Sequence, residues 1–475
     1  MLADFPRLTI TADALLPQGS FAEAQAAFLS PDADDVAELT RLCRDKNVGV
    51  VAHFYMDAEL QGVVAAMEWE HKFVSDSLQM ADRAVRMAEG GCQVIVVLGV
   101  DFMAENVRAV LDAAGHRDVR VYRVASDPIG CSLAASAETP QYDAWLRNAA
   151  RTPNSLHVIY VNTSLDTKAR AQATLPTITC TSSNVVATIL QAADQIPDVT
   201  IWYGPDTYMG HNLRTLLARV APHLLERFHV FEQGTCIVHH LFGDEVVDRV
   251  RTAHPDALLT AHLEVPGEMF ALAARAQEQD RGVVGSTSNI LQFIGRKVGE
   301  AAGRPGAQTI PVVLGTEAGM ITSIVKDVQV KLREHGRHDI AVDVIFPVAS
   351  EAVSMAPGSE LGIVPGVPGG EGCSPAGGCA TCPYMKMNSL DALLDVLRVV
   401  GTEREPTLAA YRPRRAAGTI AGRSAVDLGS EPILHMRAFQ RTGRLPDALV
   451  RDVVTRGGTG PARTPTRTAP PIDPS

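Results

Sequence analysis

The stretch Val94-Ile-Val-Val-Leu-Gly99-Val-Asp101-Phe-Met103 recurs twice further along the chain in altered form. The other copies read Thr200-Ile-Trp-Tyr-Gly204-Pro-Asp206-Thr-Tyr-Met209 and Ile310-Pro-Val-Val-Leu-Gly315-Thr-Glu317-Ala-Gly-Met320. In each copy an apolar run reaches a glycine, and a carboxylate and then a methionine follow. Such a run predicts a buried strand, and the glycine and carboxylate predict the turn after it. Because repeated units tend to pack as symmetric copies, the sequence predicts three similar structural units.

A helical pattern follows each of these turns. The first series is Met103, Val107, Val110 and Leu111, the second is Met209, Leu213, Leu216 and Leu217, and the third keeps Met320, Ile324 and Val328. Strands that alternate with amphipathic helices predict parallel α/β sheets, whose ligands bind beyond the carboxyl ends of the strands. We therefore expect three α/β sandwiches related by pseudo-threefold symmetry, facing one central cavity.

Corresponding positions of the copies lie roughly 100–110 residues apart, a spacing typical of repeated domains rather than a short solenoid. The predicted segments are an N-terminal helical extension (1–36), a first α/β repeat (37–140), a second (141–245), a third with insertions (246–400), a C-terminal extension (401–454) and a disordered tail (455–475). Within the C-terminal extension, residues 432–439 are expected to form a short helix packed on the surface.

The composition is that of an ordinary soluble globular protein, with 46% apolar and 20% charged residues in a chain of 475. A formal net charge of −11 argues against a nucleic-acid partner. No apolar run approaches the roughly 20 residues that span a bilayer, and no signal-peptide pattern opens the chain. These features predict a cytosolic protein without a membrane partner, in which the eight cysteines are thiols or metal ligands.

Three cysteines occupy corresponding places in the copies. Cys131 follows Gly99 by 32 residues, Cys236 follows Gly204 by 32, and Cys382 follows Gly315 by 67 because of an insertion. One thiolate from each copy would converge on the axis, and three thiolates leave one position of a metal centre open, which suits catalysis. This predicts a [4Fe–4S] cluster with one free iron.

The other cysteines carry weaker signals. The run Cys373-x5-Cys379-x2-Cys382-Pro383 is typical of iron–sulfur ligands, although a Cys-x2-Cys pair also fits zinc or a redox dithiol. Cys43 and Cys92 lie in apolar or helical patterns and are expected in the core, as is Cys180.

Polar pairs follow the first predicted strand of each copy at a spacing of two residues. The pairs are His53 with Tyr55, Tyr160 with Asn162, and His262 with Glu264. A hydroxyl residue at or before a predicted helix start accompanies each pair, namely Ser77, Ser182 and Thr287. Hydroxyls and backbone N–H groups at helix starts bind carboxylate or phosphate, although plain helix capping is the commoner explanation for any one of them. Three pairs that face one cavity would recognise a small, highly charged substrate.

Taken together, these residues resemble the quinolinate synthase family. The shared motifs, in collinear order across about residues 37–400, are Ala52-His-Phe-Tyr-Met-Asp57, Ser75-Asp-Ser-Leu-Gln-Met80, Gly99-Val-Asp-Phe-Met-Ala-Glu105, Gly130-Cys-Ser-Leu-Ala134, Tyr160-Val-Asn-Thr-Ser164, Cys180-Thr-Ser-Ser-Asn184, Gly234-Thr-Cys-Ile-Val-His239, Gly285-Ser-Thr-Ser288, Gly315-Thr-Glu-Ala-Gly319 and Cys379-Ala-Thr-Cys-Pro-Tyr-Met385. Two departures are His262-Leu263-Glu264, where the family usually has His-Pro-Glu, and the five-residue gap after Cys373.

The resemblance implies three Rossmann-like domains in a triangle around one [4Fe–4S] cluster. It also implies a transferase of NAD biosynthesis that condenses iminoaspartate with dihydroxyacetone phosphate, releasing phosphate and water. An L-aspartate oxidase or aspartate dehydrogenase would supply the iminoaspartate.

Residue roles also follow from the resemblance. The implied cluster ligands are Cys131, Cys236 and Cys382. The implied substrate-binding residues are His53, Ser77, Tyr160, Asn162, Ser182, His262, Glu264 and Thr287, and the implied catalytic residues are Tyr55, Glu264, His53 and Tyr160. Three alternatives stay open: an iron–sulfur hydro-lyase acting on another hydroxy acid, a non-catalytic iron–sulfur redox sensor, and a zinc-binding module.

Overall fold

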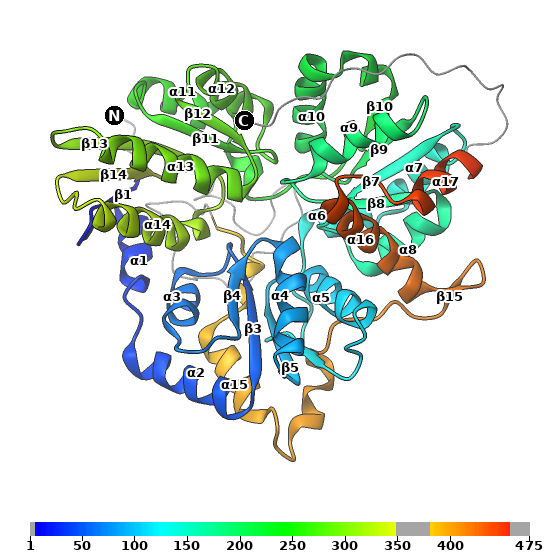
Figure 1. Ribbon diagram of the computed structural model, residues 1–475, viewed down its shortest axis with the longest axis horizontal. Coiled ribbons are helices and arrows are strands. Elements are labelled where there is room, and N and C mark those ends of the chain that lie inside the picture. The colour runs from blue at the N-terminus through cyan, green and yellow to red at the C-terminus, as the bar shows by residue number, and fades with distance from the viewer. Residues whose placement is uncertain (1–4, 348–380, 457–475) are drawn as a thin grey trace.

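The computed structural model describes residues 5–347 and 381–456, and within them the chain is α/β, with a parallel four-stranded arrangement in each of three sheets (Figure 1). This architecture agrees with the α/β class that the alternating strands and helices predict. A further two-stranded sheet lies in the C-terminal extension, formed by β15 (Thr419–Ile420) and β16 (Arg423–Ser424).

The first sheet has the strand order β4-β3-β5-β6. Its strands are β3 (Val48–His53), β4 (Lys72–Ser75), β5 (Val94–Leu98) and β6 (Arg120–Tyr122), all parallel. The associated helices are α2 (Ala33–Asp45), α3 (Ala58–Ala66), α4 (Ser77–Glu89) and α5 (Asp101–Ala113). Because β3 and β5 are buried along their whole length, β-branched valines dominate both strands.

The second sheet has the order β10-β9-β7-β8, so the strands follow one another across the sheet as they do in the first. Its strands are β7 (Ser155–Tyr160), β8 (Thr177–Cys180), β9 (Thr200–Gly204) and β10 (Phe228–Val230). Its helices are α6 (Ser132–Ala137), α7 (Pro140–Ala149), α8 (Leu165–Thr174), α9 (Val185–Gln195), α10 (Thr207–Val220), η1 (Pro222–Arg227) and η2 (His239–Leu241).

The third sheet repeats this order and extends it, as β12-β11-β13-β14-β1-β2. Its parallel strands are β11 (Leu258–His262), β12 (Gly282–Gly285), β13 (Gln308–Gly315) and β14 (Ile340–Ile345). Its helices are α11 (Asp244–Ala253), α12 (Gly267–Gln277), α13 (Thr287–Ala302), η3 (Ala318–Met320) and α14 (Ile321–Glu334).

The prediction that residues 1–36 form a helical extension is wrong for the first part of that segment. Strands β1 (Arg7–Ile10) and β2 (Leu15–Gln18) form an antiparallel hairpin that continues the third sheet from β14. Leu8 and Ile10 alternate with polar residues and are buried, which is the two-residue period of a strand. The helical expectation holds only further on, for α1 (Ser20–Phe28) and for α2, which begins within the segment.

The chain from residue 381 onward packs back on the first two units. After η5 (Met385–Met387), α15 (Leu390–Val399) contacts α2, and η6 (Glu405–Tyr411) follows. The surface helix expected at 432–439 is part of a longer helix, α16 (Ala425–Thr442), which packs against α8 and β8 with Pro432 buried (Figure 1). The first two residues of the predicted disordered tail end α17 (Asp447–Arg456), whereas the rest of the tail, Cys373 and Cys379 lie outside the described residues.

None of the helices in the described part of the chain has the length and apolarity needed to cross a bilayer.

Candidate active site

All of the residues predicted to bind a cluster or substrate or to act in catalysis line one cavity of about 80 Å³. They are His53, Tyr55, Ser77, Cys131, Tyr160, Asn162, Ser182, Cys236, His262, Glu264, Thr287 and Cys382. The structure brings them together because β3, β7 and β11 end at His53, Tyr160 and His262, and the carboxyl ends of parallel strands meet at one edge of each sheet.

Two of the strand-end pairs form the same local turn. The Nδ1 atom of His53 accepts a hydrogen bond from the backbone N–H of Tyr55 at 3.2 Å, and Nδ1 of His262 accepts one from the N–H of Glu264 at 3.3 Å. With Nδ1 as acceptor, the ring proton of each neutral histidine is on Nε2. Nε2 of His262 lies 3.1 Å from Oγ of Ser182, so it donates to that hydroxyl.

Both histidines are neutral near neutral pH. Burial lowers the pKa of His53 to about 3 and that of His262 to about 4, although the Glu264 carboxylate opposes both shifts. Each ring therefore offers a neutral N–H donor rather than a positive charge.

Glu264 lies at the centre of the polar contacts. Its Oε1 accepts a hydrogen bond from the Tyr160 hydroxyl at 2.5 Å, and its Oε2 lies 3.2 Å from Nδ1 of His239. Burial on its own would raise the pKa of Glu264, but the contacts with His239, His262 and Tyr160 outweigh it and lower the pKa to about 2. The side chain is therefore an ionised carboxylate in a buried cavity.

The two tyrosines are proton donors. Burial raises the pKa of Tyr55 and of Tyr160 well above the usual value, and the Glu264 charge raises both further. Tyr55 hydroxyl lies 3.3 Å from Oγ1 of Thr316 in the third unit. Both phenols are thus neutral at physiological pH; the Tyr160 hydroxyl donates to Glu264, and the Tyr55 hydroxyl can donate to an anionic substrate.

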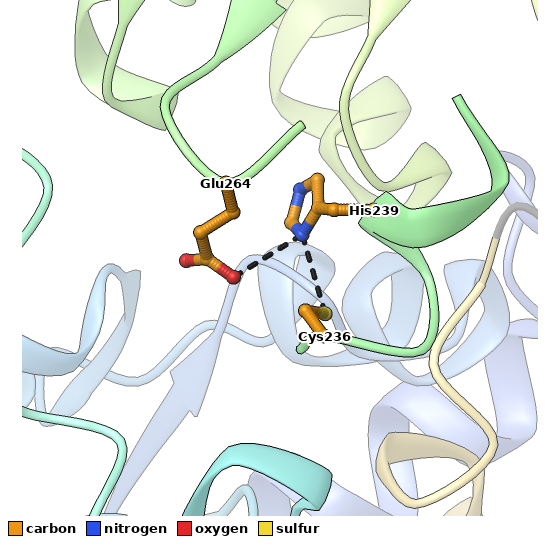
Figure 2. A group of neighbouring side chains, drawn as sticks. All are labelled: Cys236, His239 and Glu264. Carbon is orange, nitrogen blue, oxygen red and sulfur yellow. Dashed lines mark hydrogen bonds and ion pairs between the residues drawn. The ribbon is translucent and has the colours of Figure 1, made fainter. Parts of the chain in front are cut away.

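His239 is a cavity residue that the sequence-based site prediction omitted (Figure 2). Its Nδ1 lies 3.2 Å from Oε2 of Glu264 and 3.3 Å from Sγ of Cys236, and its Nε2 lies 3.3 Å from Oγ1 of Thr316. The three-residue spacing in Cys236-Ile-Val-His239, one helical turn, was the available signal. The ligand atoms of Cys236, His239 and Glu264 lie within 4.8 Å of one another, a set that could also hold a single metal ion.

The three repeat-matched thiols face the cavity and influence one another. Burial raises the pKa of Cys131 to about 11 and that of Cys382 to about 12, and it raises the pKa of Cys236 well above the usual value. The charges of Cys382 and Cys131 also raise the pKa of Cys236, and all three cysteines line the same cavity. Three thiolates in this cavity would repel one another. A bound metal centre would stabilise all three in the charged form.

Each cysteine segment docks on the repeated glycine–carboxylate turn of its own unit. The N–H of Asp101 donates to the carbonyl of Ile129 at 2.9 Å, and that of Thr207 donates to the carbonyl of Gly234 at 2.7 Å. These carbonyls lie two residues before Cys131 and Cys236. In the third unit Oε1 of Glu317 accepts from the N–H of Cys382 itself at 3.2 Å. The repeated turns therefore hold the cysteines in place.

The remaining described cysteines lie in the core. Cys43, Cys92 and Cys180 are fully buried, which confirms the prediction that they are core thiols.

Comparison with known proteins gives one family and a consistent set of relatives. The chain matches the family model described as quinolinate synthetase A protein over residues 37–346. It is 51% identical to a chloroplastic quinolinate synthase of Nicotiana tabacum over 96% of this chain and 67% of the relative, and 50% identical to one of Arabidopsis thaliana over 95% and 67%. A quinolinate synthase of Nostoc sp. is 26% identical over 80% of this chain and 91% of the relative.

The chain spans about two thirds of the length of the plant relatives. Their names also correct one expectation. The predicted cytosolic location is wrong, because the plant relatives at about 50% identity are named chloroplastic. The cytosolic prediction depended on composition and on the lack of a signal-peptide pattern, and neither property distinguishes the cytosol from a plastid stroma.

Proposed function

This chain belongs to the quinolinate synthetase A family, and on that premise we propose that it condenses iminoaspartate with dihydroxyacetone phosphate. The enzyme forms quinolinate and releases phosphate and water, which makes it a transferase in NAD biosynthesis. An L-aspartate oxidase or aspartate dehydrogenase is the source of its iminoaspartate. The observation that carries the proposal is the single buried cavity in which three thiols, an ionised carboxylate and neutral tyrosine and histidine donors meet.

The cavity suits substrates that carry carboxylate and phosphate groups. Ser77 and Thr287 are the first residues of α4 and α13, and both line the cavity. Their hydroxyls can donate to an anion in the cavity, whereas the N–H groups of Leu78 and Gln79 at the start of α4 already donate to the Asp76 side chain. The neutral N–H groups of His53 and His262 and the amide of Asn162 complete a set of donors that binds negative charge.

Cys131, Cys236 and Cys382 would hold a [4Fe–4S] cluster, with one iron left without a protein ligand. Thiolates are the ligands that such clusters prefer, and three buried thiols that disfavour one another as free anions fit that role. When bound, the cluster would supply a Lewis acid that polarises a substrate oxygen as water leaves.

The side chains of the cavity would move the protons. Glu264, ionised and hydrogen-bonded to Tyr160, accepts a proton from the carbon skeleton of the substrate. The neutral Tyr55 hydroxyl donates to an oxygen on which negative charge develops, and the Tyr160 hydroxyl holds Glu264 in place. His53 holds the substrate through an Nε2–H group that its own loop orients, and His262 donates from Nε2 to Ser182, whose hydroxyl faces the cavity.

We also propose that the three units are related by approximate threefold symmetry around this cavity. The support is the shared strand order of the three sheets, together with one strand-end pair and one cysteine from each unit at the same cavity.

The test is anaerobic purification, iron and sulfide analysis, and an assay of quinolinate with iminoaspartate and dihydroxyacetone phosphate. About four irons per chain with quinolinate formed is the expected result. A full cluster without quinolinate would favour a hydro-lyase of another substrate or a redox sensor. One zinc per chain without sulfide would instead favour the Cys236, His239 and Glu264 group as the metal site and overturn the proposal.

Gly234→Ala is expected to remove most of the iron and the activity. A Cβ atom at Gly234 would lie 2.1 Å from the carbonyl oxygen of Pro205, so the cysteine segment must move away from the turn that holds it. Gly299→Ala is the control, since a Cβ there meets nothing within 4 Å among the described residues and the position is helical. Iron per chain and thermal unfolding measure both variants; full iron in Gly234→Ala would contradict the docking argument.

A further inference from the structure

The loops after β3, β7 and β11 share a pattern of buried hydrogen bonds. Each loop carries one reacting or binding side chain at its middle residue, namely Tyr55, Asn162 or Glu264. In each loop a single side-chain nitrogen donates to the two backbone carbonyls on either side of that residue. The residues that donate are Gln61, Lys168 and Asn212.

In the first unit, Nε2 of Gln61 donates to the carbonyl of Phe54 at 2.8 Å and to that of Met56 at 2.7 Å. In the second unit, Nζ of Lys168 donates to the carbonyl of Val161 at 3.1 Å and to that of Thr163. Both donors lie on the helix that follows the loop, and each reaches the carbonyls seven and five residues earlier. Gln61 and Lys168 therefore occupy equivalent positions.

The third unit obtains the same contact from a neighbouring unit. The position equivalent to Gln61 and Lys168 is the apolar Phe270, which makes no such bond. Instead Asn212, on α10 of the second unit, donates through Nδ2 to the carbonyl of Leu263 at 2.9 Å and to that of Val265 at 2.8 Å. A different residue thus makes the same pair of bonds around Glu264.

These donors also lie at the boundaries between units. Nε2 of Gln61 also lies 2.7 Å from the carbonyl of Gly319, in the turn that carries Glu317, so its two N–H groups are shared among three carbonyls. Oε2 of Glu105, on α5 of the first unit, accepts from the N–H of Leu165 at 2.7 Å, at the start of the helix that carries Lys168. Each loop is therefore tied to an adjacent unit.

Loss of these hydrogen bonds would be destabilising because the three donor side chains are buried. Gln61, Lys168 and Asn212 are 1%, 0% and 2% exposed. A buried amide or amine without a hydrogen-bond partner is strongly unfavourable, so each side chain is held against its carbonyls. Burial lowers the pKa of Lys168 to about 7, with Glu105 opposing the shift, and both the charged and the neutral amine keep N–H groups to donate.

We propose that Gln61, Lys168 and Asn212 are positioning residues that orient Tyr55, Asn162 and Glu264 toward the substrate by holding the peptide groups on both sides of each. The proposal rests on the proposed function, because it concerns the same cavity. A pair of bonds that fixes both flanking peptide planes leaves the middle side chain little freedom to turn. Displacement of a reacting group by about 1 Å can lower a rate on the order of 10²-fold.

The test compares Lys168→Met with Lys168→Gln. Methionine fills similar space without a donor, whereas glutamine is the residue that the first unit uses at the equivalent position. With iminoaspartate and dihydroxyacetone phosphate, Lys168→Met is expected to lower kcat about 10²-fold, with iron and sulfide unchanged. Lys168→Gln is expected to restore kcat to within about tenfold of the parent. Hydrogen–deuterium exchange of residues 161–165 should rise in Lys168→Met and return toward the parent level in Lys168→Gln.

A matched control lies one turn further along the same helix. Gln172 is 3% exposed, and it accepts from the N–H of Thr177 at 2.9 Å and donates to Glu431 at 3.0 Å. Gln172→Met should lower the unfolding temperature but leave kcat and exchange of the loop unchanged. If Lys168→Met fails to fold, Asn212→Leu tests the same proposal at the loop of Glu264.

The outcomes distinguish failure of the proposed function from failure of the proposed positioning role. Absence of quinolinate from the parent protein would overturn the proposed function, while loop exchange would still test the positioning role. An active parent whose Lys168→Met variant keeps kcat within about twofold, with unchanged loop exchange, would overturn the positioning proposal. So would a kcat loss in Gln172→Met that matches the loss in Lys168→Met, because the effect would then be general destabilisation.

Discussion

Replacing Cys236 with alanine is expected to abolish both the iron–sulfur cluster and quinolinate formation. Cys236 is the proposed ligand from the second unit, and its sulfur faces the same cavity as Cys131 and Cys382. With two thiolates left, the cluster would lack a ligand that no described cysteine in the core can replace, because Cys43, Cys92 and Cys180 are buried outside the cavity lining. Iron and sulfide per chain after anaerobic purification, with the quinolinate assay, measure the result. Cys131→Ala and Cys382→Ala should behave in the same way.

Cys43→Ala is the matched control for these variants. Cys43 is fully buried on α2, where its replacement removes one sulfur from an apolar core and costs roughly 1 kcal/mol of stability. Cluster content and activity should stay at the parent level. A Cys236→Ala protein that keeps four irons per chain would contradict the assignment of one ligand to each unit.

Glu264→Gln is expected to lower kcat by about 10²- to 10⁴-fold, the range that removal of a general base produces. The substitution keeps the size of the side chain and an oxygen for the Tyr160 hydroxyl, but it removes the charge that accepts a proton. Because the pKa of Glu264 is lowered to about 2, the carboxylate is ionised throughout the neutral range. The factor by which the substitution lowers kcat should therefore be nearly constant between about pH 5 and pH 8. Steady-state kinetics at several pH values measure it.

Glu268→Gln controls for loss of a nearby negative charge. Glu268 is exposed in the first turn of α12, four residues after Glu264, and lies outside the cavity lining. Its substitution should change kcat less than about twofold and stability by no more than about 1 kcal/mol. A Glu264→Gln variant with kcat within tenfold of the parent would exclude Glu264 as the proton acceptor and leave His239 for that role.

Local patterns predicted much of the fold. The three glycine–carboxylate turns do follow strands β5, β9 and β13, and the helical series beginning at Met103 and Met209 lie in α5 and α10. The hairpin of β1 and β2 was missed because the segment is short and its pairing partner, β14, lies more than 300 residues away. A four-residue strand carries too little periodicity to identify without that partner.

The residues of the candidate site were likewise predicted only in part from local patterns. His53, Tyr160 and His262 were found because each ends a strongly apolar strand, and the strand period is a local property. His239 was omitted because it lies in a short 3₁₀ turn and because its contact in the site is with Glu264, a residue of another unit. Its three-residue spacing from Cys236 was the one local signal, and that spacing alone does not show that the ring contacts Glu264.

The amino-acid order alone specifies which residues stand at the strand ends and which cysteines match among the repeats, because these depend on hydrophobic periodicity and spacing. The fold was needed to reveal how the units are joined. Asn212 holds the loop of Glu264 from about 50 residues away, whereas Gln61 and Lys168 hold their own loops from the next helix. A hydrogen bond depends on distance and direction in space, and packing of one unit against another sets both.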